Sequence, residues 1–249
     1  MVAALRSAGC VFAEDEAALL HEAAHDDTEL AELVRRRVSG LPLEQVLGWA
    51  EFCGLRISLS PGVFVPRRRT EFLAEQAIAL TGSGPVVELC CGAGAVAAAV
   101  LVAHPSVELY AADVDPAAVS CAAGNLPGAA GVVRGDLYRA LPDELRGRVE
   151  VVVANAPYVP TGEVGMMPPE ARLHEPAVAL DGGADGLDIQ RRVAAEAPRW
   201  LAPGGNLLIE TSRRQAPGTA ALFTEAGLLP RILHCEERDA TVVAGTRPR

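Results

Sequence analysis

Four consecutive residues, Asn155, Ala156, Pro157 and Tyr158, combine groups that could position a planar, nitrogen-bearing substrate for reaction. Asn155 offers a carbonyl acceptor and an amide donor in one plane, and Tyr158 offers a ring face. The apolar run 149–154 before them has the length and composition of a strand buried on both faces. Because Pro157 cannot continue a ladder, the chain should leave the sheet there, at the edge where open α/β sheets bind ligands. An ordinary strand-to-turn junction is the alternative, since such junctions also often contain Asn and Pro.

Three acidic residues, Glu88, Asp113 and Asp136, stand at or just after the ends of three successive predicted strands. Because the carboxyl ends of parallel strands meet at one edge of a sheet, these side chains should line one pocket. Glu88 suits a cationic ligand. Asp113 could accept hydrogen bonds from both hydroxyls of a ribose, and Asp136 could accept one from an adenine amine. Loop solvation or helix capping is the alternative, and capping is favoured for Asp115.

A short turn with Cys90, Cys91, Gly92 and Gly94 joins the first of these strands to a helix. Glycines there allow a ligand to approach the backbone, and the start of the helix supplies free N–H groups. Such a turn also occurs in dinucleotide-binding folds and is not specific alone. The two cysteines are expected to pack as small apolar side chains.

The hydrophobic pattern predicts a helical region followed by alternating strands and helices. Residues 14–38 read as helical with a turn and cap at 26–28, and residues 55–59 read as a hairpin strand. The alternation predicts a parallel sheet with right-handed crossovers, closed by a terminal antiparallel hairpin. The expected strands are 85–90, 107–112, 131–134, 149–154, 205–211, 231–235 and 241–245, and the expected helices are 70–80, 96–103, 116–125, 185–201 and 215–226.

Composition limits the class of protein. Half of the 249 residues are hydrophobic, which predicts one α/β domain with a small appendage rather than disorder. No apolar run could span a membrane and the amino terminus is a poor secretion signal, so a cytoplasmic protein without membrane contact is expected. The six cysteines lack metal or disulfide spacing, and no metal is expected. The net charge of −10 argues against a broad nucleic-acid surface, although residues 35–37 and 67–69 are arginine triplets. A solvated face is favoured for the first triplet.

Taken together, these features resemble a class I methyltransferase dependent on S-adenosyl-L-methionine. Residues 155–158 are similar to the Asn-Pro-Pro-Tyr signature of methyltransferases that act on planar nitrogens. Residues 60–71 resemble a Pro-Arg-Pro-x-Thr-Glu segment, and residues 174–187 resemble a Glu-Pro…Gly-Gly-x-Asp-Gly loop. Both belong to the protein-(glutamine-N5) methyltransferases that modify peptide chain release factors, and Glu210 also matches an acid of that family. The resemblance covers nearly the whole chain.

The resemblance implies a Rossmann-like α/β fold whose seven-stranded, mostly parallel sheet ends in an antiparallel hairpin. Residues 61–249 would form this domain, and residues 1–60 a small helical substrate-recognition domain with a linker hairpin. It implies methylation of a glutamine N5 in a protein, expected to be a release factor, with S-adenosyl-L-methionine as cofactor. The implied catalytic residues are Asn155, Ala156, Pro157 and Tyr158; the cofactor residues are Glu88, Cys90, Gly92, Gly94, Asp113, Asp136, Leu137 and Asn155; the substrate residues are Phe64, Pro66, Arg67, Glu175 and Pro176. In this scheme Asn155 Oδ1 and the Ala156 carbonyl accept the two amide N–H groups.

The chain departs from the family pattern at several positions. Cys90 stands where the family usually has glycine, and Ala156 replaces a proline. Arg68 and Arg69 replace a proline and its neighbour, which predicts a looser and more basic loop. The helical region at the amino terminus is also shorter than usual in the family, which bears on substrate identity more than on chemistry. Three alternatives stay open: a base N-methyltransferase on RNA or DNA that uses residues 67–69, a catalytically silent relative, and a small-molecule N-methyltransferase.

Overall fold

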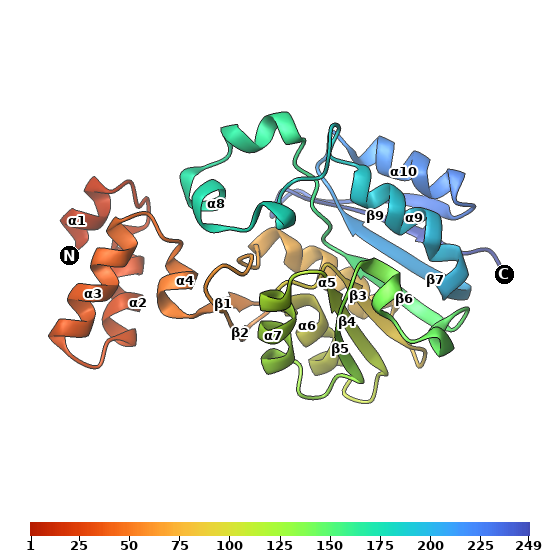
Figure 1. Ribbon diagram of the computed structural model, residues 1–249, viewed down its shortest axis with the longest axis horizontal. Helices are drawn as coiled ribbons and strands as arrows, with labels where there is room; N and C mark the ends of the chain where they lie inside the picture. The colour runs from red at the N-terminus through yellow and green to blue at the C-terminus, as the bar shows by residue number, and fades with distance from the viewer.

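The predicted alternation of strands and helices forms one seven-stranded sheet in the computed structural model, which describes residues 1–249 (Figure 1). The strand order is β5-β4-β3-β6-β7-β9-β8, and the first five strands are parallel. β9 runs antiparallel to both β7 and β8, so the predicted mostly parallel sheet with a terminal hairpin is confirmed. The strands are β3 (Val86–Leu89), β4 (Leu109–Asp113), β5 (Gly131–Arg134), β6 (Val149–Ala154), β7 (Leu201–Glu210), β8 (Leu229–Cys235) and β9 (Ala240–Thr246).

Helices cover both faces of the sheet because successive strand residues point to opposite sides. Val151 and Val153 of β6 belong to one buried cluster, whereas Val152 belongs to the other. The first cluster includes α5 (Glu71–Leu80), α6 (Ala95–Ala103) and α7 (Pro116–Asn125), and the second includes α9 (Asp188–Trp200) and α10 (Ala216–Glu225). None of the helices is both long enough and apolar enough to cross a membrane.

The predicted element bounds hold best where the local pattern is strongest. β5, β6 and α7 have the predicted bounds, whereas α9 begins at Asp188 after a turn in which Asp185 Oδ1 accepts from the Leu187 N–H. The sequence reading missed the short helices α1 (Val2–Ser7), α4 (Leu43–Leu47) and α8 (Pro169–His174). Helices of five or six residues show too little periodicity to recognise, but Pro168 at the N-cap of α8 and Pro169 at its first position were an available start signal.

The amino-terminal helices form a small body beside the sheet (Figure 1). α2 (Ala13–Ala23) and α3 (Asp27–Val38) are joined by the predicted turn, where Asp26 caps α3 by accepting from the Glu29 N–H. Helices α1 to α4 share their own cluster of seven buried side chains. The hairpin of β1 (Trp49–Phe52) and β2 (Leu55–Ser58) instead packs Phe52 and Ile57 into the buried cluster that includes α5, α6 and α7.

The prediction of a solvated face for the first arginine triplet is wrong at Arg37. Its side chain is only 8% exposed and forms ion pairs with Glu16 and Glu170, both at 2.6 Å. Arg37 also donates to the Leu41 carbonyl. The two ion pairs keep the pKa of Arg37 above its usual value, although burial acts to lower that pKa. One buried guanidinium therefore joins α2, α3 and α8.

We predict that Arg37→Ala lowers the free energy of unfolding by about 3 kcal/mol, because it leaves a mostly buried carboxylate on Glu16 without a partner. Urea denaturation followed by circular dichroism measures this loss. Arg35→Ala is the matched control, since Arg35 lies on the same helix but is 75% exposed and paired only with Glu32. That control should change stability by less than about 1 kcal/mol. Equal losses in the two variants would contradict the structural role of Arg37.

Candidate active site

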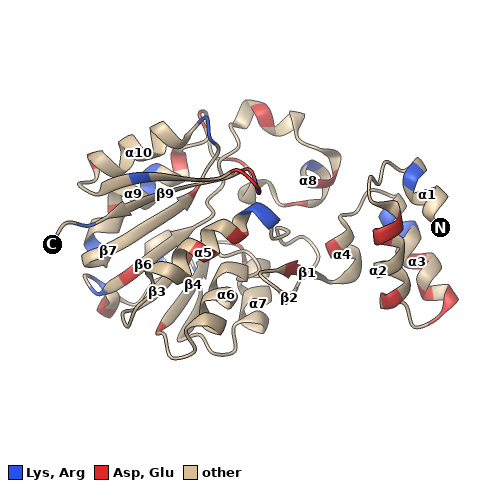
Figure 2. Cartoon of the chain, turned by 180° about the vertical axis from the view of Figure 1, so that it is seen from behind, with Lys and Arg blue, Asp and Glu red and all other residues tan.

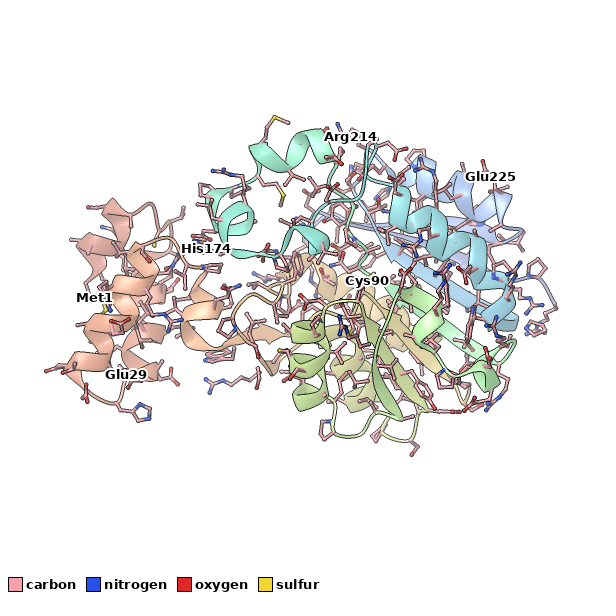
Figure 3. All side chains as sticks on the ribbon, viewed as in Figure 1. Met1, Glu29, Cys90, His174, Arg214 and Glu225 are labelled. Atoms are coloured by element: carbon pink, nitrogen blue, oxygen red, sulfur yellow. The ribbon has the colours of Figure 1, made fainter.

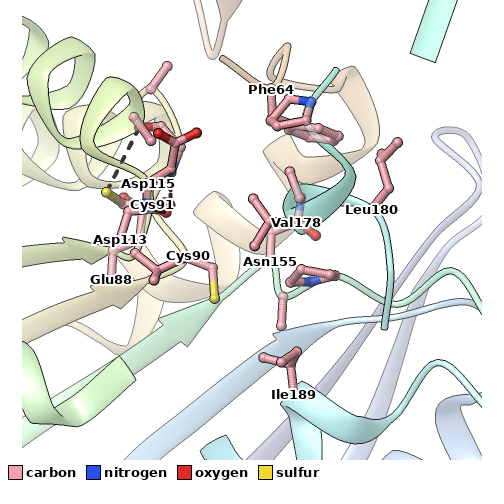
Figure 4. A pocket seen from close by; sticks show the side chains of 18 of the residues that line it. Phe64, Glu88, Cys90, Cys91, Asp113, Asp115, Asn155, Val178, Leu180 and Ile189 are labelled. Carbon is pink, nitrogen blue, oxygen red and sulfur yellow. Dashed lines mark hydrogen bonds between the residues drawn. The ribbon is translucent and has the colours of Figure 1, made fainter. Parts of the chain in front are cut away.

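The loops at the carboxyl ends of β3, β4 and β6 surround a cavity of about 310 Å³. All residues of the predicted site line this cavity except Gly94 and Glu175. Figure 4 shows Glu88 and Asp113 on one side, facing Phe64 and Asn155 on the other. The cavity therefore has an acidic end beside β3 and β4 and an end formed by the Asn155 motif.

Glu88 lies one residue before the end of β3, at the acidic end of the cavity, and is almost completely buried. Its Oε2 accepts from the Ala97 N–H of α6 at 2.9 Å. Burial raises the pKa of Glu88 to about 8, although this hydrogen bond acts to lower it. A cationic ligand beside this buried carboxyl group would stabilise its ionised form, because a nearby positive charge lowers the pKa of a carboxyl group.

Asp113 ends β4 and has both carboxylate oxygens held by backbone donors. Oδ2 accepts from the Gly92 N–H at 2.9 Å, and Oδ1 accepts from the Asp115 N–H at 2.9 Å. Burial raises the pKa of Asp113, and these hydrogen bonds oppose that rise. Asp115 caps α7 by accepting from the Ala117 N–H, as predicted, and also lines the cavity. The fixed Asp113 carboxylate is suited to accept from a pair of hydroxyls.

Asp136 reaches the cavity from the loop after β5, but it is already ion-paired. Both its carboxylate oxygens lie 2.6 Å from Arg192 Nη2 of α9. The adjacent Leu137 has φ of +54° and lines the cavity with a mostly buried side chain. If an adenine amine donated to Asp136 as predicted, that carboxylate would accept from both the amine and Arg192.

The turn after β3 keeps a left-handed backbone at Cys90 despite the loss of the family glycine. Cys90 has φ of +54° and Gly92 has φ of +53°. A side chain in this region costs roughly 1–2 kcal/mol, which glycine would avoid. Cys90 lies at the centre of the molecule (Figure 3) and lines the cavity, and burial raises the pKa of its thiol. Both cysteines pack as small apolar side chains, as expected: Cys91 is buried in one cluster, and the partly buried Cys90 packs against the other.

Gly94 lies outside the cavity because it is the residue that caps α6. It has φ of +75°, and a Cβ atom there would lie 2.8 Å from Leu126 Cδ1. Its small size therefore serves the packing of α6 against α7, which carries Leu126 at its end.

Asn155 follows β6 with its side chain in a fixed orientation. Its Nδ2 donates to Thr70 Oγ1 at 3.3 Å, and neither its Oδ1 nor the Ala156 carbonyl has a donor within the chain. Thr70 is 4% exposed and acts to lower the pKa of the nearby Glu210 carboxyl group. Because Thr70 Oγ1 accepts from the Asn155 amide nitrogen, the Asn155 oxygen is left free at the cavity wall.

Arg69, Tyr158 and Glu210 form a contact group at the same end. Arg69 Nη2 donates to the Tyr158 hydroxyl at 2.7 Å, and Arg69 Nε lies 3.4 Å from Glu210 Oε1. Glu210 is 2% exposed, and burial raises its pKa against the opposing effects of Thr70 and Arg69. Burial likewise raises the pKa of Tyr158 to about 12, so its hydroxyl stays protonated. The predicted residue set omitted Arg69, Thr70 and Glu210, although Glu210 had been noted as a family acid.

The second arginine triplet is therefore not the loose loop that was expected. Arg68–Thr70 forms a 3-10 turn, labelled η1, before α5. Arg67 donates from Nη2 to Glu175 Oε2 at 2.5 Å and lies over the Phe64 ring, with Cζ 4.7 Å from its centroid. Glu175 is fully buried behind the cavity wall, where its Oε1 also accepts from the Val65 N–H. Glu175 thus positions Arg67 rather than facing the cavity.

The glycine-rich loop after α8 packs directly on the Asn155 motif. A Cβ atom on Gly182 would lie 2.7 Å from the Pro157 carbonyl oxygen, and one on Gly186 would collide with the Tyr158 carbonyl. Gln215 Nε2 donates to that Tyr158 carbonyl at 2.9 Å. The loop and α10 therefore hold the backbone of the motif in place. No group of three or more His, Cys, Asp or Glu side chains is arranged to hold a metal ion.

The chain is similar in sequence to known methyltransferases. A family model described as the methyltransferase small domain matches residues 54–168. The chain is 35% identical to the release factor glutamine methyltransferase of Geobacter sulfurreducens over 199 residues, which are 78% of this chain and 69% of that protein.

Two further proteins are similar to the chain. The 4-amino-L-phenylalanine/4-methylamino-L-phenylalanine methyltransferase of Streptomyces pristinaespiralis is 39% identical over 78% of this chain and 69% of its own length. The fold also resembles a 16S rRNA methyltransferase of T. Thermophilus, solved in complex with AdoMet and guanosine. That likeness has a TM-score of 0.58 at 20% identity, over 80% of this chain and 49% of the other.

The raised pKa of Glu88 predicts a loss of stability at alkaline pH. Its ordinary value of 4.5 in the unfolded chain rises to about 8 in the fold, because burial disfavours the carboxylate. The stability that the neutral carboxyl contributes is therefore complete below pH 4.5 and is lost as the pH rises through about 8. Urea unfolding at pH 6 and pH 9.5 should show a smaller loss for Glu88→Gln than for the natural chain. A loss of equal size in both would show that Glu88 is ionised in the fold at both pH values.

Proposed function

The chain belongs to the release factor glutamine methyltransferase family, and from this premise we propose that it methylates the N5 of a glutamine in a peptide chain release factor. We propose S-adenosyl-L-methionine as the methyl donor. The free acceptor groups of Asn155 and Ala156 carry this proposal, because they match the two N–H groups of a side-chain amide.

The acidic end of the cavity fits the cofactor in charge and in hydrogen-bonding groups. Glu88 and Asp113 would face a ligand that carries an ammonium, a sulfonium and a ribose, and Gly92 leaves open space where a side chain would intrude. S-adenosyl-L-methionine supplies, when bound, a methyl group that is already activated on a positively charged sulfur. A strong base is therefore not needed, and the protein has to align and orient the acceptor.

Asn155 and Ala156 would orient the acceptor amide. An amide nitrogen is a poor nucleophile because its lone pair is delocalised into the carbonyl. If Asn155 Oδ1 and the Ala156 carbonyl each accept one N–H, the nitrogen lone pair is directed out of the amide plane toward the methyl group. The same two oxygens favour the positive charge that develops on nitrogen as the new bond forms. Tyr158 would pack against the amide plane.

The departures from the family pattern leave these groups in place. Ala156 keeps the backbone carbonyl that its proline counterpart would present, and it is held in a buried position. Cys90 keeps the left-handed backbone of a glycine. We therefore favour an active enzyme over a catalytically silent relative.

The amino-terminal helices and α8 would bind the protein substrate. α8 and its flanking turns lie between those helices and the sheet (Figure 1) and expose Met166, Leu173 and Val178, of which Val178 lines the cavity. Gln45 donates from Nε2 to the His174 carbonyl, which links α4 to α8. Exposed apolar side chains beside a cavity suit the recognition of a peptide segment.

Methylation of a nucleic-acid base is less well supported. Figure 2 shows basic residues at the start of α5, but Arg67 there is paired with the fully buried Glu175. A net charge of −10 also opposes phosphate binding. Methylation of a free aromatic amine is the second candidate function, favoured by the 39% identity to the 4-amino-L-phenylalanine methyltransferase.

We predict that Asn155→Ala lowers kcat for glutamine methylation by about 10²–10³-fold, as expected when a preorganised polar group at the reacting centre is removed. The assay measures transfer of labelled methyl from S-adenosyl-L-methionine to purified release factors, with peptide mass spectrometry to locate the label. Affinity for the cofactor, measured by calorimetry, should change little.

Total RNA and 4-amino-L-phenylalanine serve as parallel acceptors in that assay. Label on a release-factor glutamine supports the proposed function. Label only on RNA or only on the aromatic amine would replace it with the corresponding alternative. A parallel fall in cofactor affinity and turnover would contradict the role given to Asn155.

We predict that Thr70→Val lowers kcat more than it raises KM, because Asn155 loses the acceptor that fixes its orientation. Thr70→Ser keeps the hydroxyl and should restore most of the rate. Steady-state kinetics of the two variants measure the difference. If Thr70→Ser were as slow as Thr70→Val, packing of the lost methyl group rather than the hydrogen bond would explain the effect.

A further inference from the structure

Three arginines line the cavity, and they differ in how fully their charges are paired. Arg67 lies 2.5 Å from Glu175, and Arg192 lies 2.6 Å from both oxygens of Asp136. Arg69 lies 3.4 Å from Glu210, which makes its ion pair the longest of the three. Its side chain is 47% exposed, whereas that of Glu210 is 2% exposed. The Glu210 carboxyl group is therefore buried behind Arg69, and the Arg69 guanidinium is exposed.

Arg69 also has unused hydrogen-bond donors. A guanidinium carries five N–H groups in a planar fork. Arg69 uses Nε for Glu210 and one Nη2 hydrogen for the Tyr158 hydroxyl, and Nη1 has no partner in the chain. Two adjacent nitrogens with free hydrogens match the two oxygens of a carboxylate.

The position of Arg69 places these donors at the acceptor end of the cavity. Arg69 contacts Tyr158, and its neighbour Thr70 contacts Asn155, so the guanidinium and the Asn155 oxygen belong to one wall. The acids Glu88 and Asp113 lie at the other end. The cavity therefore has two carboxyl groups where a cationic cofactor would bind and a guanidinium where the acceptor would bind.

We propose that Arg69 determines specificity by binding a carboxylate of the acceptor, close to the nitrogen that is methylated. This inference rests on the proposed methyl transfer to an acceptor nitrogen, and it narrows the acceptor to one that carries a carboxylate. The carboxylate is either the free α-carboxylate of an amino acid or the side chain of an acidic residue beside a target glutamine.

Binding of matched probes tests this proposal without the need for turnover. In the presence of S-adenosyl-L-homocysteine, NMR titration compares N-acetyl-glutamine with N-acetyl-glutaminamide, which differ by the α-carboxylate. A second pair, the capped dipeptides Gln-Asp and Gln-Asn, differs by a side-chain carboxylate. We expect the acidic member of at least one pair to bind about tenfold more tightly. The first pair reports a free amino acid and the second an acidic neighbour in a protein.

Two variants assign the preference to Arg69. Arg69→Gln should abolish the difference between the members of a pair, and Arg69→Lys should retain part of it, because a lysine keeps the charge but loses the planar fork. Arg68→Gln is the matched control: Arg68 lies on the same turn, is exposed and does not line the cavity, so the preference should remain. Unchanged affinity for S-adenosyl-L-homocysteine shows that each variant is folded.

Equal affinities within both pairs, a preference that survives in Arg69→Gln, or the absence of binding by any acidic probe would overturn the proposal. A third pair, 4-amino-L-phenylalanine and its carboxamide, separates this inference from the proposed function. A carboxylate preference in that pair that depends on Arg69, together with no methylation of glutamine, would uphold the role of Arg69 and reject the glutamine substrate.

Discussion

The site depends on a close backbone contact between the glycine-rich loop and the end of β6. Gly182 and Gly186 lie against the Pro157 and Tyr158 backbone with no room for a Cβ atom, and Gln215 holds the Tyr158 carbonyl from α10. Once Pro157 has taken the chain out of the sheet, no ladder restrains the motif. The loop replaces that ladder, so the Asn155 and Ala156 oxygens can stay fixed without being used by the protein.

Glu210 has a similar effect on the side chains. It is a buried carboxylate at the end of β7 that faces Arg69, Tyr158 and Thr70. Removing a carboxylate from water is costly, and these neighbours offset the cost only in part, as its raised pKa indicates. Glu210 holds Arg69 and the Tyr158 hydroxyl together at the acceptor end of the cavity.

The acidic and basic side chains of the cavity come from different elements of the fold. The ends of β3 and β4 bring Glu88 and Asp113 together, while η1 brings Arg69 to the wall formed after β6. A cationic donor would meet these carboxyl groups, and an anionic acceptor would meet the guanidinium. The helices at the amino terminus join this site through α8, where Arg37 binds Glu170 and Gln45 binds the His174 carbonyl. Any protein segment that reaches the cavity past α8 would therefore meet both parts of the chain.

The amino-acid pattern alone is enough to predict the sheet, its flanking helices and most of the cavity wall. Strand and helix patterns are local, and the carboxyl ends of parallel strands share one edge, so Glu88, Asp113 and Asn155 could be placed together in advance. The partners of Arg37 and Arg69, in contrast, follow only from the packing of distant segments. Arg37 meets Glu170 across 133 positions and Arg69 meets Glu210 across 141. An arginine triplet has the same local pattern whether it is solvated or paired, because its partners lie on distant segments that only the packed chain brings close.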